Sequence, residues 1–457
     1  MLDLLHAKAQ RPKCDGTSRR EFLQVGALGG MFGLTLPDLL RAQAAEAKAT
    51  GKISKRPAIV LLFLDGGASQ FETFDPKMSA PQEYRSLFGA TQSTLPGHDF
   101  CGLLPKMATL TDRMAIVKSF THKDGDHGGG THWVKTGYPW PPEFLGKAVG
   151  PPQQQPSIGS IVSRTLGPIN RETGVPTYVR VQSNHGGYAG DDAVWLGQEF
   201  NPFRVYADAK GRSNPMLANM GMKLESARLQ DRRALLQAFD NLDRTLDKTR
   251  IMDGMDGFQQ QALNVITGKA KEAFDLSQED EKVKEKYGPG LGQEMLLARR
   301  LCEAGAGFVT LNNGYWDHHS GIIPGCKDLC PKLDHAVHAF MEDVKERGLE
   351  NDILLIITGE FGRTPRVGNY GKDKDAGRDH WAGLNPLAFC GGGLKMQQVI
   401  GESDDRGGYP KSRPIWPQDY MATIFQVLGM DQRMQFTHPT GRPMYMIEDG
   451  KPIEELF

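Results

Sequence analysis

Acidic and imidazole side chains recur in short polar segments of this 457-residue sequence. Carboxylates and imidazoles are common protein ligands of divalent metals such as zinc and manganese. The pairs that most strongly suggest metal ligation are Asp317 with His319 and Asp379 with His380. A histidine next to tryptophan can equally be a packed, hydrogen-bonded residue, so each pair alone leaves both interpretations open. The candidate metal ligands are Asp65, Asp317, His319, Glu360, Asp379 and His380.

These candidates follow apolar runs that predict buried strands. The runs lack alternation, which is typical of strands covered on both faces of a parallel sheet. Helical stretches separate them, so we predict an α/β fold with a mostly parallel central sheet and helices on both faces. Ligands of such sheets bind beyond the C-terminal ends of the strands. The predicted strands are Ala58–Leu64, Met114–Val117, Tyr178–Val181, Phe308–Leu311, Ile353–Ile357 and Leu387–Phe389.

Two further stretches have a helical pattern. Residues from about 200 to 290 are charged and show no predicted strand, so we expect a helical insertion there. Asp419–Leu428 places Met421, Ile424, Phe425 and Leu428 on one face, which predicts an amphipathic C-terminal helix.

The N-terminus resembles a targeting segment. Arg19 and Arg20 precede Phe-Leu, an uncharged stretch runs from Gln24 to Pro37, and Ala42-Gln43-Ala44 fits a cleavage site. The stretch is shorter than the ~20 apolar residues of a spanning helix. We therefore expect a twin-arginine signal over residues 1–45, a mature domain over 52–457, the twin-arginine translocation machinery as a partner, no permanent membrane anchor, and a periplasmic or secreted protein.

Composition excludes some partners. The chain has 54 basic and 55 acidic residues, a net charge of -1. This balance gives no attraction to nucleic acid or to anionic membranes. Cys14 lies in the signal, and Cys326 and Cys330 are spaced C-x3-C. These two are either a disulfide formed outside the cytoplasm or unrelated thiols.

Several motifs occur in a recognisable order: LDGGASQFETFDPK, HGGGTHWVKTG, NNGYWDHHSG, ITGEFGRTP, GRDHW, AFCGGGLK and VIGESDD. Over roughly residues 55 to 455 they resemble the domain-of-unknown-function family 1501, whose members are often labelled sulfatase. That family resembles a branch of the alkaline phosphatase and sulfatase superfamily. The resemblance implies an alkaline phosphatase-like α/β fold, typically two metal positions, and hydrolysis of phosphate or sulfate esters.

The resemblance also implies roles for individual residues. Asp65 matches the metal-ligating Asp after the first strand, and Glu360 matches the Asp of a Thr-x-Asp-His ligand pair. Phe361 stands where that pair has His or Asn, so one ligand is missing. The remaining matches are Asp317 and His319 with a shortened Asp-x-x-x-His motif, and His380 with the late histidine ligand.

The nucleophile departs from the superfamily pattern. HGGGTHWVKTG resembles the sulfatase signature, and its cysteine position falls on His127 when the segments are aligned on Thr136-Gly137. Thr131 lies nearby but out of register. Three alternatives remain open: Thr131 attacks after a local shift, a water activated by a metal attacks directly, or the site only binds.

Two functions follow from these observations. The first is an exported metal-dependent hydrolase of sulfate or phosphate esters, using one or two zinc, calcium or manganese ions. Its substrate would be a small-molecule or polysaccharide anionic ester, and Arg363, Arg378 and Lys395 are candidates for binding the anionic group. The catalytic candidates are Thr131, His127 and Arg363. The alternative is a non-catalytic exported binding or cell-surface protein that retains the fold.

Overall fold

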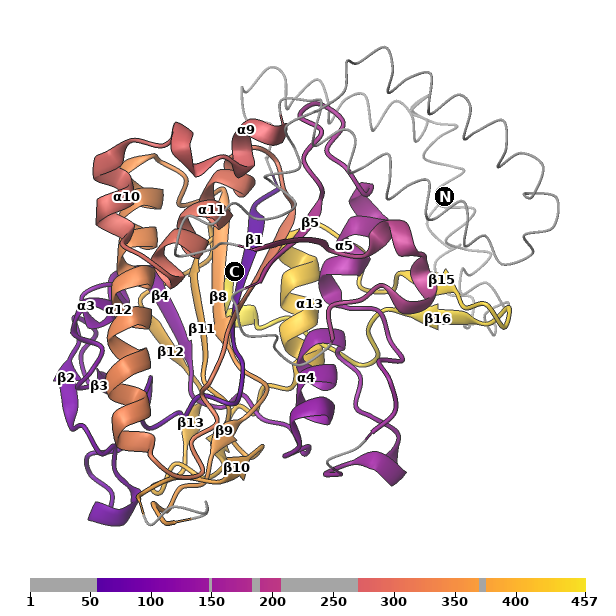
Figure 1. Cartoon of the computed structure of the whole chain (residues 1–457). Coiled ribbons are helices and arrows are strands. Elements are labelled where there is room, and N and C mark those ends of the chain that lie inside the picture. The colour runs from indigo at the N-terminus through magenta and orange to yellow at the C-terminus, as the bar shows by residue number, and fades with distance from the viewer. Residues whose placement is uncertain (1–55, 148–149, 183–189, 207–269, 370–374) are drawn as a thin grey trace, which may run out of the picture. The chain divides into compact units, whose positions relative to one another are not determined.

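The computed structural model describes residues 56–457, except 148–149, 183–189, 207–269 and 370–374 (Figure 1). The predicted signal segment lies outside the described residues, as does most of the predicted helical insertion. No helix in the described part of the chain combines the length and apolar character needed to cross a membrane.

An eight-stranded sheet forms the centre of the domain, in the order β12-β4-β11-β8-β1-β7-β5-β6. All strands run parallel except β11, which is antiparallel to both of its neighbours. The predicted mostly parallel sheet is therefore confirmed. Its strands are β1 (Ala58–Leu64), β4 (Met114–Val117), β5 (Tyr178–Gln182), β6 (Phe203–Tyr206), β7 (Phe308–Asn313), β8 (Ile353–Thr358), β11 (Leu387–Gly391) and β12 (Gln398–Ile400).

Two details differ from the sequence-based expectation. Strand β11 follows β8 through loops and the short strands β9 (Gly362–Arg363) and β10 (His380–Trp381), with no helix described between them. A connection that returns from the same edge without a crossover makes the next strand antiparallel. In addition, two strands of the sheet were not predicted. Strand β12 pairs in parallel with β4, and β6, which lies within the 200–290 stretch where no strand was expected, pairs in parallel with β5.

Helices cover both faces of the sheet, as predicted (Figure 1). The side chains of β1 alternate between two cores. Val60 and Leu62 pack in one core with residues of α11 (Leu291–Glu303) and α12 (Ile322–Glu346). Ile59 and Leu61 pack in the other core with residues of three helices. These helices are α4 (His127–Thr136), α5 (Ile158–Leu166) and α13 (Pro417–Val427), of which the last is the predicted C-terminal helix.

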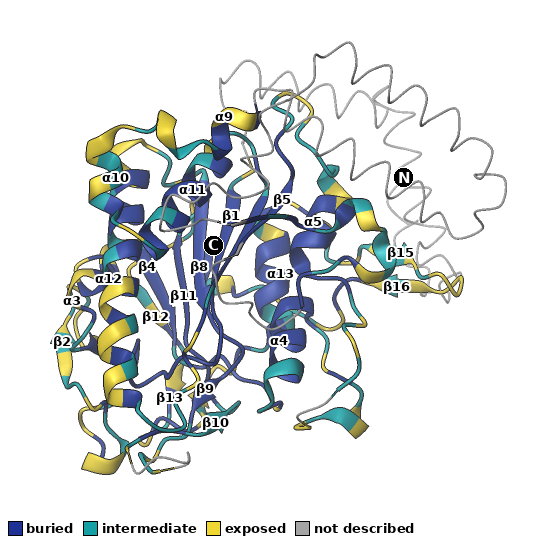
Figure 2. Cartoon of the chain, in the orientation of Figure 1, coloured by how far each residue is buried: buried dark blue, intermediate teal, exposed yellow. Residues whose placement is uncertain are grey.

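The buried sheet between its helical layers is visible in Figure 2, where β1 and β8, whose residues are all buried, are dark blue. Short helices and strands outside this sheet complete the described part of the domain. These are α3 (Pro105–Ala108), α9 (Ala270–Phe274), α10 (Glu281–Tyr287), β2 (Ala90–Gln92), β3 (Asp99–Cys101), β13 (Glu402–Ser403), β14 (Pro410–Ser412), β15 (Gln435–Thr437) and β16 (Pro443–Tyr445).

Candidate metal centre

The candidate ligands meet where parallel strands end. Strand β1 lies between β7 and β8 and is parallel to both, so the three C-terminal ends share one edge of the sheet. Asp65 follows β1, Asp317 lies in the loop after β7, and Glu360 follows β8. His127 is the first residue of α4, and His380 begins β10.

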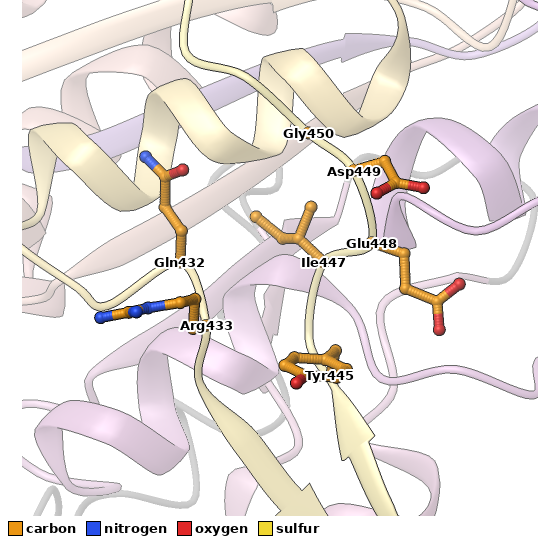
Figure 3. A pocket seen from close by; sticks show the side chains of 7 residues that line it. All are labelled: Gln432, Arg433, Tyr445, Ile447, Glu448, Asp449 and Gly450. Carbon is orange, nitrogen blue, oxygen red and sulfur yellow. The ribbon is translucent and has the colours of Figure 1, made fainter. Parts of the chain in front are cut away.

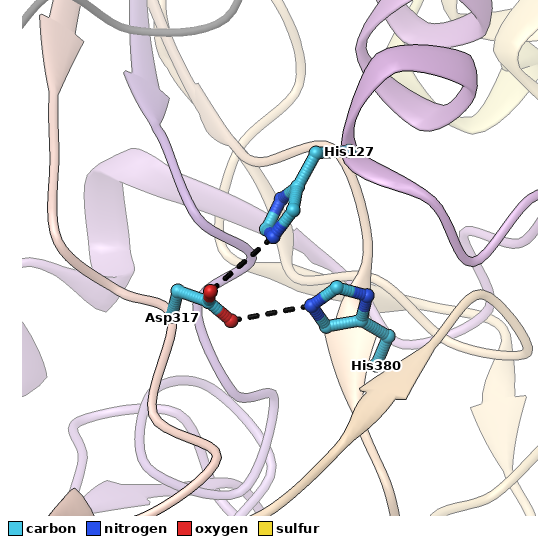
Figure 4. Close-up of side chains that lie close together, drawn as sticks. All are labelled: His127, Asp317 and His380. Carbon is cyan, nitrogen blue, oxygen red and sulfur yellow. Dashed lines mark hydrogen bonds and ion pairs between the residues drawn. The ribbon is translucent and has the colours of Figure 1, made fainter. Parts of the chain in front are cut away.

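Three imidazole rings point their Nε2 atoms at the carboxylate of Asp317. His319 Nε2 lies 3.0 Å and His380 Nε2 lies 3.2 Å from Asp317 Oδ1, and His127 Nε2 lies 3.4 Å from Asp317 Oδ2. His319 Nε2 and His380 Nε2 are 3.0 Å apart. Figure 4 shows the carboxylate of Asp317 between His127 and His380. Four potential ligand groups from three separate segments of the chain therefore converge on one point.

The opposite ring nitrogen of each histidine is already engaged. Oxygens of carboxylates and backbone carbonyls accept hydrogen bonds, so each such contact favours a proton on Nδ1 and leaves Nε2 as an acceptor in the neutral ring. Metal-binding histidines are oriented in the same way by an acceptor on their far nitrogen. The acceptors are Glu360 Oε1 at 2.8 Å from His127, the carbonyl oxygen of Gly125 at 2.8 Å from His380, and Asp379 Oδ1 at 3.0 Å from His319.

The Nε2 lone pairs of the three histidines and the carboxylate oxygens of Asp317 are all acceptors. They repel one another unless a proton or a cation lies between them. Burial alone would lower the pKa of His127, but its hydrogen bonds to Asp317 and Glu360 raise that pKa to about 9. Burial would raise the pKa of Asp317, but hydrogen bonds from His127 and His380 and the charge of Arg363 hold it well below its usual range. The cluster therefore favours positive charge next to Asp317.

Glu360 is fully buried at the end of β8. Its Oε1 atom accepts from the backbone amide of Gly66 at 2.7 Å and lies next to His127. Its Oε2 atom is buried and has no hydrogen-bond partner among the described residues. The backbone oxygen of Glu360 lies 2.6 Å from His122 Nε2, and burial lowers the pKa of His122 to about 4.

Asp65 lies beside this centre but is not part of the converging groups. Among the described residues these groups are His127 with Asp317 and His380, and His319 with Asp379 and His380. Asp65 Oδ2 accepts from the amide of Asn312 at 2.7 Å, whereas Asp65 Oδ1 is buried without a partner in the described chain. Burial raises the pKa of Asp65 to about 7, although the charge of Lys135 opposes this.

The two arginines expected to bind an anion are both used within the protein. Arg363 is fully buried and donates to Asp317 Oδ1 at 2.6 Å, to the Gly67 carbonyl at 2.8 Å and to the Gly66 carbonyl. Arg378 is also fully buried and forms an ion pair with Glu72 at 3.1 Å. Arg363 therefore holds the carboxylate of Asp317, and neither side chain faces solvent.

Lys395 lies at the other edge of the sheet. It follows β11, whose last residue, Gly391, is paired with Leu354 near the start of β8. The antiparallel direction of β11 thus carries Lys395 away from the site. From the sequence, Lys395 was named as a candidate for binding the anionic group, and the structure does not bring the residue to the cluster.

Thr131 lies within α4, and Phe361 packs against His127, the first residue of that helix. Thr131 is fully buried, and its Oγ1 atom has no hydrogen-bond partner among the described residues. Phe361 is also fully buried and packs against two of the imidazoles, with ring centroids 5.1 Å from His127 and 4.4 Å from His380. Phe361 thus forms a wall of the cluster and offers no ligand atom.

Some functional features were not evident from the sequence. His127 was expected to be catalytic, and the structure places it in a group of side chains that could hold a metal ion. The orienting oxygen of Gly125 and the amide of Gly66 are backbone groups, whose only sequence signal is the glycine-rich DGDHGGG and LDGG segments. His318, between two cluster residues, points away to Cys326, with Sγ 4.0 Å from its Nδ1. Cys326 and Cys330 are both free thiols on α12.

A separate hollow lies near the C-terminus and shares no residue with the cluster (Figure 3). It has a volume of about 410 Å³. Its lining residues are Gln432, Arg433, Tyr445, Ile447, Glu448, Asp449 and Gly450.

Known proteins give three kinds of comparison. No curated protein matches the sequence. A sulfatase from Pseudoalteromonas sp. is similar in structure, with 14% identity and a TM-score of 0.41 over 88% of this chain and 73% of that one. A phosphonate monoester hydrolase from Silicibacter pomeroyi has 11% identity and a TM-score of 0.40 over 87% and 76%.

A third solved structure is a protein of the alkaline phosphatase superfamily from Vibrio parahaemolyticus, with 14% identity and a TM-score of 0.39 over 82% of this chain and 67% of that one. The family model described as "Protein of unknown function (DUF1501)" matches residues 56–457, which is the whole domain that begins with β1. The chain therefore belongs to the DUF1501 family, as its motifs indicated.

Proposed function

We propose that this protein is an exported metal-dependent hydrolase of sulfate or phosphate esters. The observation that carries the proposal is the convergence of three Nε2 atoms on Asp317 while each Nδ1 atom is engaged elsewhere. This donor set of three imidazoles and one carboxylate suits zinc or manganese. The ligands in this proposal are His127, Asp317, His319 and His380.

The unpaired buried oxygens beside the cluster support a need for positive charge. Glu360 Oε2 and Asp65 Oδ1 are both buried without hydrogen-bond partners in the described chain. Leaving buried charged groups unpaired is costly, so these oxygens fit a site that holds a cation. Glu360 and Asp379 would orient ligands, and Asp65 would contribute to the local negative charge or to a second ion.

A divalent ion held here would act as a Lewis acid and lower the pKa of a water molecule. The chain's own residues would prepare the site for this chemistry. Arg363 fixes the carboxylate of Asp317, Phe361 packs against the rings of His127 and His380, and Glu360 keeps Nε2 of His127 directed at the ligand position. These contacts limit reorganisation during the reaction.

Direct attack by water is the mechanism that the site favours. Thr131 is buried inside α4, and the hydrogen bonds described for Asp317, His319 and His380 involve no serine, threonine or cysteine. A covalent ester intermediate on Thr131 would require this helix to rearrange. We therefore assign His127 to metal binding rather than to nucleophilic attack.

Metal analysis and chelation test this proposal. The purified mature protein should contain tightly bound zinc or manganese, and chelator should lower its melting temperature. A ligand that binds only the folded state at a hundredfold excess over its Kd stabilises it by about 2.7 kcal/mol. Hydrolysis of para-nitrophenyl sulfate or para-nitrophenyl phosphate should stop with the chelator and return when metal is added.

Variants give the matched comparison. Asp317→Ala and His380→Ala should abolish both bound metal and sensitivity to chelator. His438→Ala, which changes a histidine that packs edge-on against Trp195 away from the cluster, should behave like the wild type. A wild type that contains no metal and melts identically with and without chelator would refute the hydrolase proposal and favour the non-catalytic binding protein.

A further inference from the structure

The side chains of the proposed metal centre lie on loops that are partly open to solvent. Those of Asp317, His319 and Asp379 are 36%, 32% and 47% exposed. Core packing does not hold exposed side chains, so the backbone beneath them must be fixed by other contacts. Metal ligands have to stay within roughly 0.5 Å of their working positions. The contacts that fix these loops therefore determine how well the cluster can bind an ion.

Arg378 lies where the two ligand loops meet. It directly precedes Asp379, and its backbone amide donates to the carbonyl oxygen of His318 at 3.0 Å. His318 in turn lies between Asp317 and His319 in the sequence. The backbone of Arg378 thus joins the loop after β7 to the segment that enters β10.

The guanidinium of Arg378 uses all five of its N–H donors inside the protein. Its Nε and Nη2 atoms donate to the carboxylate of Glu72 at 3.1 and 3.4 Å. The remaining bonds go to the backbone oxygens of Thr364 at 3.0 Å, of Arg85 at 2.7 Å and of Pro365. Arg378 and Glu72 are both buried, so bulk water does not compete for these bonds. The side chain of Arg378 is therefore held in one position.

Glu72 belongs to the segment that follows β1, and this segment also holds the second buried arginine. The side-chain amide of Gln70 donates to the backbone oxygen of Arg363 at 2.9 Å and accepts from its backbone amide at 2.8 Å. Arg363 then donates to Asp317 Oδ1 and, at 3.1 Å, to the backbone oxygen of Arg378. The segment after β1 thus holds both arginines, and each arginine contacts a ligand loop.

Stability alone does not account for the Glu72–Arg378 ion pair. The cost of removing two charges from water offsets most of their attraction, so apolar side chains of similar volume often stabilise a fold equally well. Apolar side chains, however, make no directed contacts. The planar fork of an arginine fixes several acceptors in a defined geometry, and here these acceptors lie on segments that also carry the cluster.

We propose that Arg378 and Glu72 are positioning residues that set the metal affinity of the cluster. They act through the backbone of the ligand loops rather than by binding the ion. The pair keeps Asp317, His319 and His380 together before a divalent ion arrives, so little reorganisation is needed on binding. This inference rests on the proposed hydrolase function and adds the residues that hold its ligands in place.

Zinc affinity, measured on the whole mature protein by competition with a chelator, tests the proposal. Arg378→Gln and Glu72→Gln should each weaken zinc binding about 10- to 100-fold, the range typical of groups that orient metal ligands. The variant that carries both changes should bind zinc no more weakly than the weaker-binding single variant, because the two side chains act as one unit. Additive losses would show that they act independently and would overturn the proposal.

Arg299→Gln is the matched control for the loss of a buried ion pair. Arg299 is buried on α11 and donates to Asp343 of α12 at 2.9 Å and to Glu279 at 2.6 Å. Helices α11 and α12 lead into the starts of β7 and β8, at the opposite edge of the sheet from the ligands.

Arg299→Gln should therefore lower the melting temperature of the metal-free protein, as Arg378→Gln does. It should nevertheless change zinc affinity by less than about twofold, because distant sites act independently. Equal losses of zinc affinity in the two variants would reflect weaker folding alone and would overturn the positioning role.

A milder pair of variants keeps the test decisive if circular dichroism shows that Arg378→Gln does not fold. Arg378→Lys retains the positive charge but not the planar fork. It should still weaken zinc binding, whereas Arg299→Lys should not. Zinc affinity of the wild type in Arg378→Lys would overturn the proposal in that case.

NMR of the metal-free protein separates this inference from the proposed function. With isotope-labelled histidine, the ring-nitrogen signals of His319 and His380 should shift in Arg378→Gln and stay in place in Arg299→Gln. If the wild type binds zinc but Arg378→Gln changes neither these signals nor the affinity, the positioning role is overturned and the hydrolase stands. If the wild type binds no zinc, the hydrolase is overturned, and a shift of these signals in Arg378→Gln still supports the positioning role.

Discussion

Each histidine of the cluster divides its two ring nitrogens between orientation and ligation. The orienting groups differ in kind: a buried carboxylate for His127, a backbone carbonyl for His380 and a half-exposed carboxylate for His319. A buried acceptor is less screened by solvent than an exposed one, so Glu360 should matter most. Groups that orient metal ligands typically change metal affinity 10- to 100-fold when they are removed.

Glu360→Gln should therefore weaken zinc binding by about 10- to 100-fold while leaving the protein folded. The glutamine keeps the shape of the side chain but removes the negative charge that orients His127. Calorimetric titration of the metal-free protein with zinc measures the change. Asp405→Asn, at a carboxylate that is 97% exposed, is the control, and equal affinities in the two variants would contradict the assigned role of Glu360.

At the scale of elements, a buried ion cluster ties α4 to β5. Asp191 lies 3.0 Å from Lys135 of α4 and 3.0 Å from Arg180 of β5, and its backbone oxygen accepts from Ser157 at 2.9 Å. All three charged side chains are at most 5% exposed. Because α4 also begins with His127, this cluster helps to fix the helix that supplies a proposed ligand.

Asp191→Asn should lower the free energy of unfolding by about 3–5 kcal/mol, because it leaves two buried cations without their carboxylate. Urea denaturation monitored by circular dichroism measures the loss. The neighbouring Asp192→Asn is the matched control. Both side chains of the ion pair between Asp192 and Arg204 are exposed to solvent, so this pair should contribute at most about 1 kcal/mol to the free energy of unfolding. Similar losses of unfolding free energy in the two variants would show that the buried ion cluster stabilises the fold no more than the exposed ion pair does.

At the scale of the whole molecule, the two cores on either side of the sheet must bury polar groups as well as apolar ones. Glu294 on α11 is 5% exposed, and its Oε2 atom has no hydrogen-bond partner in the described chain. Burial raises the pKa of Glu294 to about 7 from 4.5. The folded protein therefore keeps a proton on this carboxyl at a pH where the unfolded chain has released it.

The sign of the resulting pH dependence follows directly. The raised pKa contributes stability that is fully present below pH about 4.5 and is lost as the pH rises to about 7. Glu294→Gln should remove this dependence and increase the free energy of unfolding at pH 8 by up to about 3 kcal/mol. Measuring the free energy of unfolding of the wild type and of Glu294→Gln at pH 5 and at pH 8 tests this prediction. A variant that is equally destabilised at both pH values would contradict it.

Export is the other prediction at this scale. Replacing Arg19 and Arg20 together by Lys should leave the precursor in the cytoplasm, because the twin-arginine pathway recognises that pair. Cell fractionation followed by immunoblotting measures the distribution, and Arg11→Lys is the control. Normal export of the double variant would show that residues 1–45 are not a twin-arginine signal.

Local sequence determined six of the eight strands of the central sheet and the C-terminal helix. Runs such as Ala58–Leu64 and Ile353–Thr358 are apolar at nearly every position, which burial on both faces of a sheet accommodates. The motif order was sufficient to identify the DUF1501 family. Asp317, His319 and His380 could be named as ligand candidates because residue type and position after a strand are local properties.

The tertiary structure decided what no local pattern contains. The contact between His127 and Glu360 joins residues 233 positions apart, and that between Arg363 and Asp317 joins residues 46 positions apart. Such pairings depend on which strands become neighbours in the sheet. The direction of β11 likewise follows from its connection to β8, and it placed Lys395 at the opposite edge. Sequence therefore supplied the candidate metal ligands, and the packing of distant segments decided which nitrogen of each histidine faces Asp317.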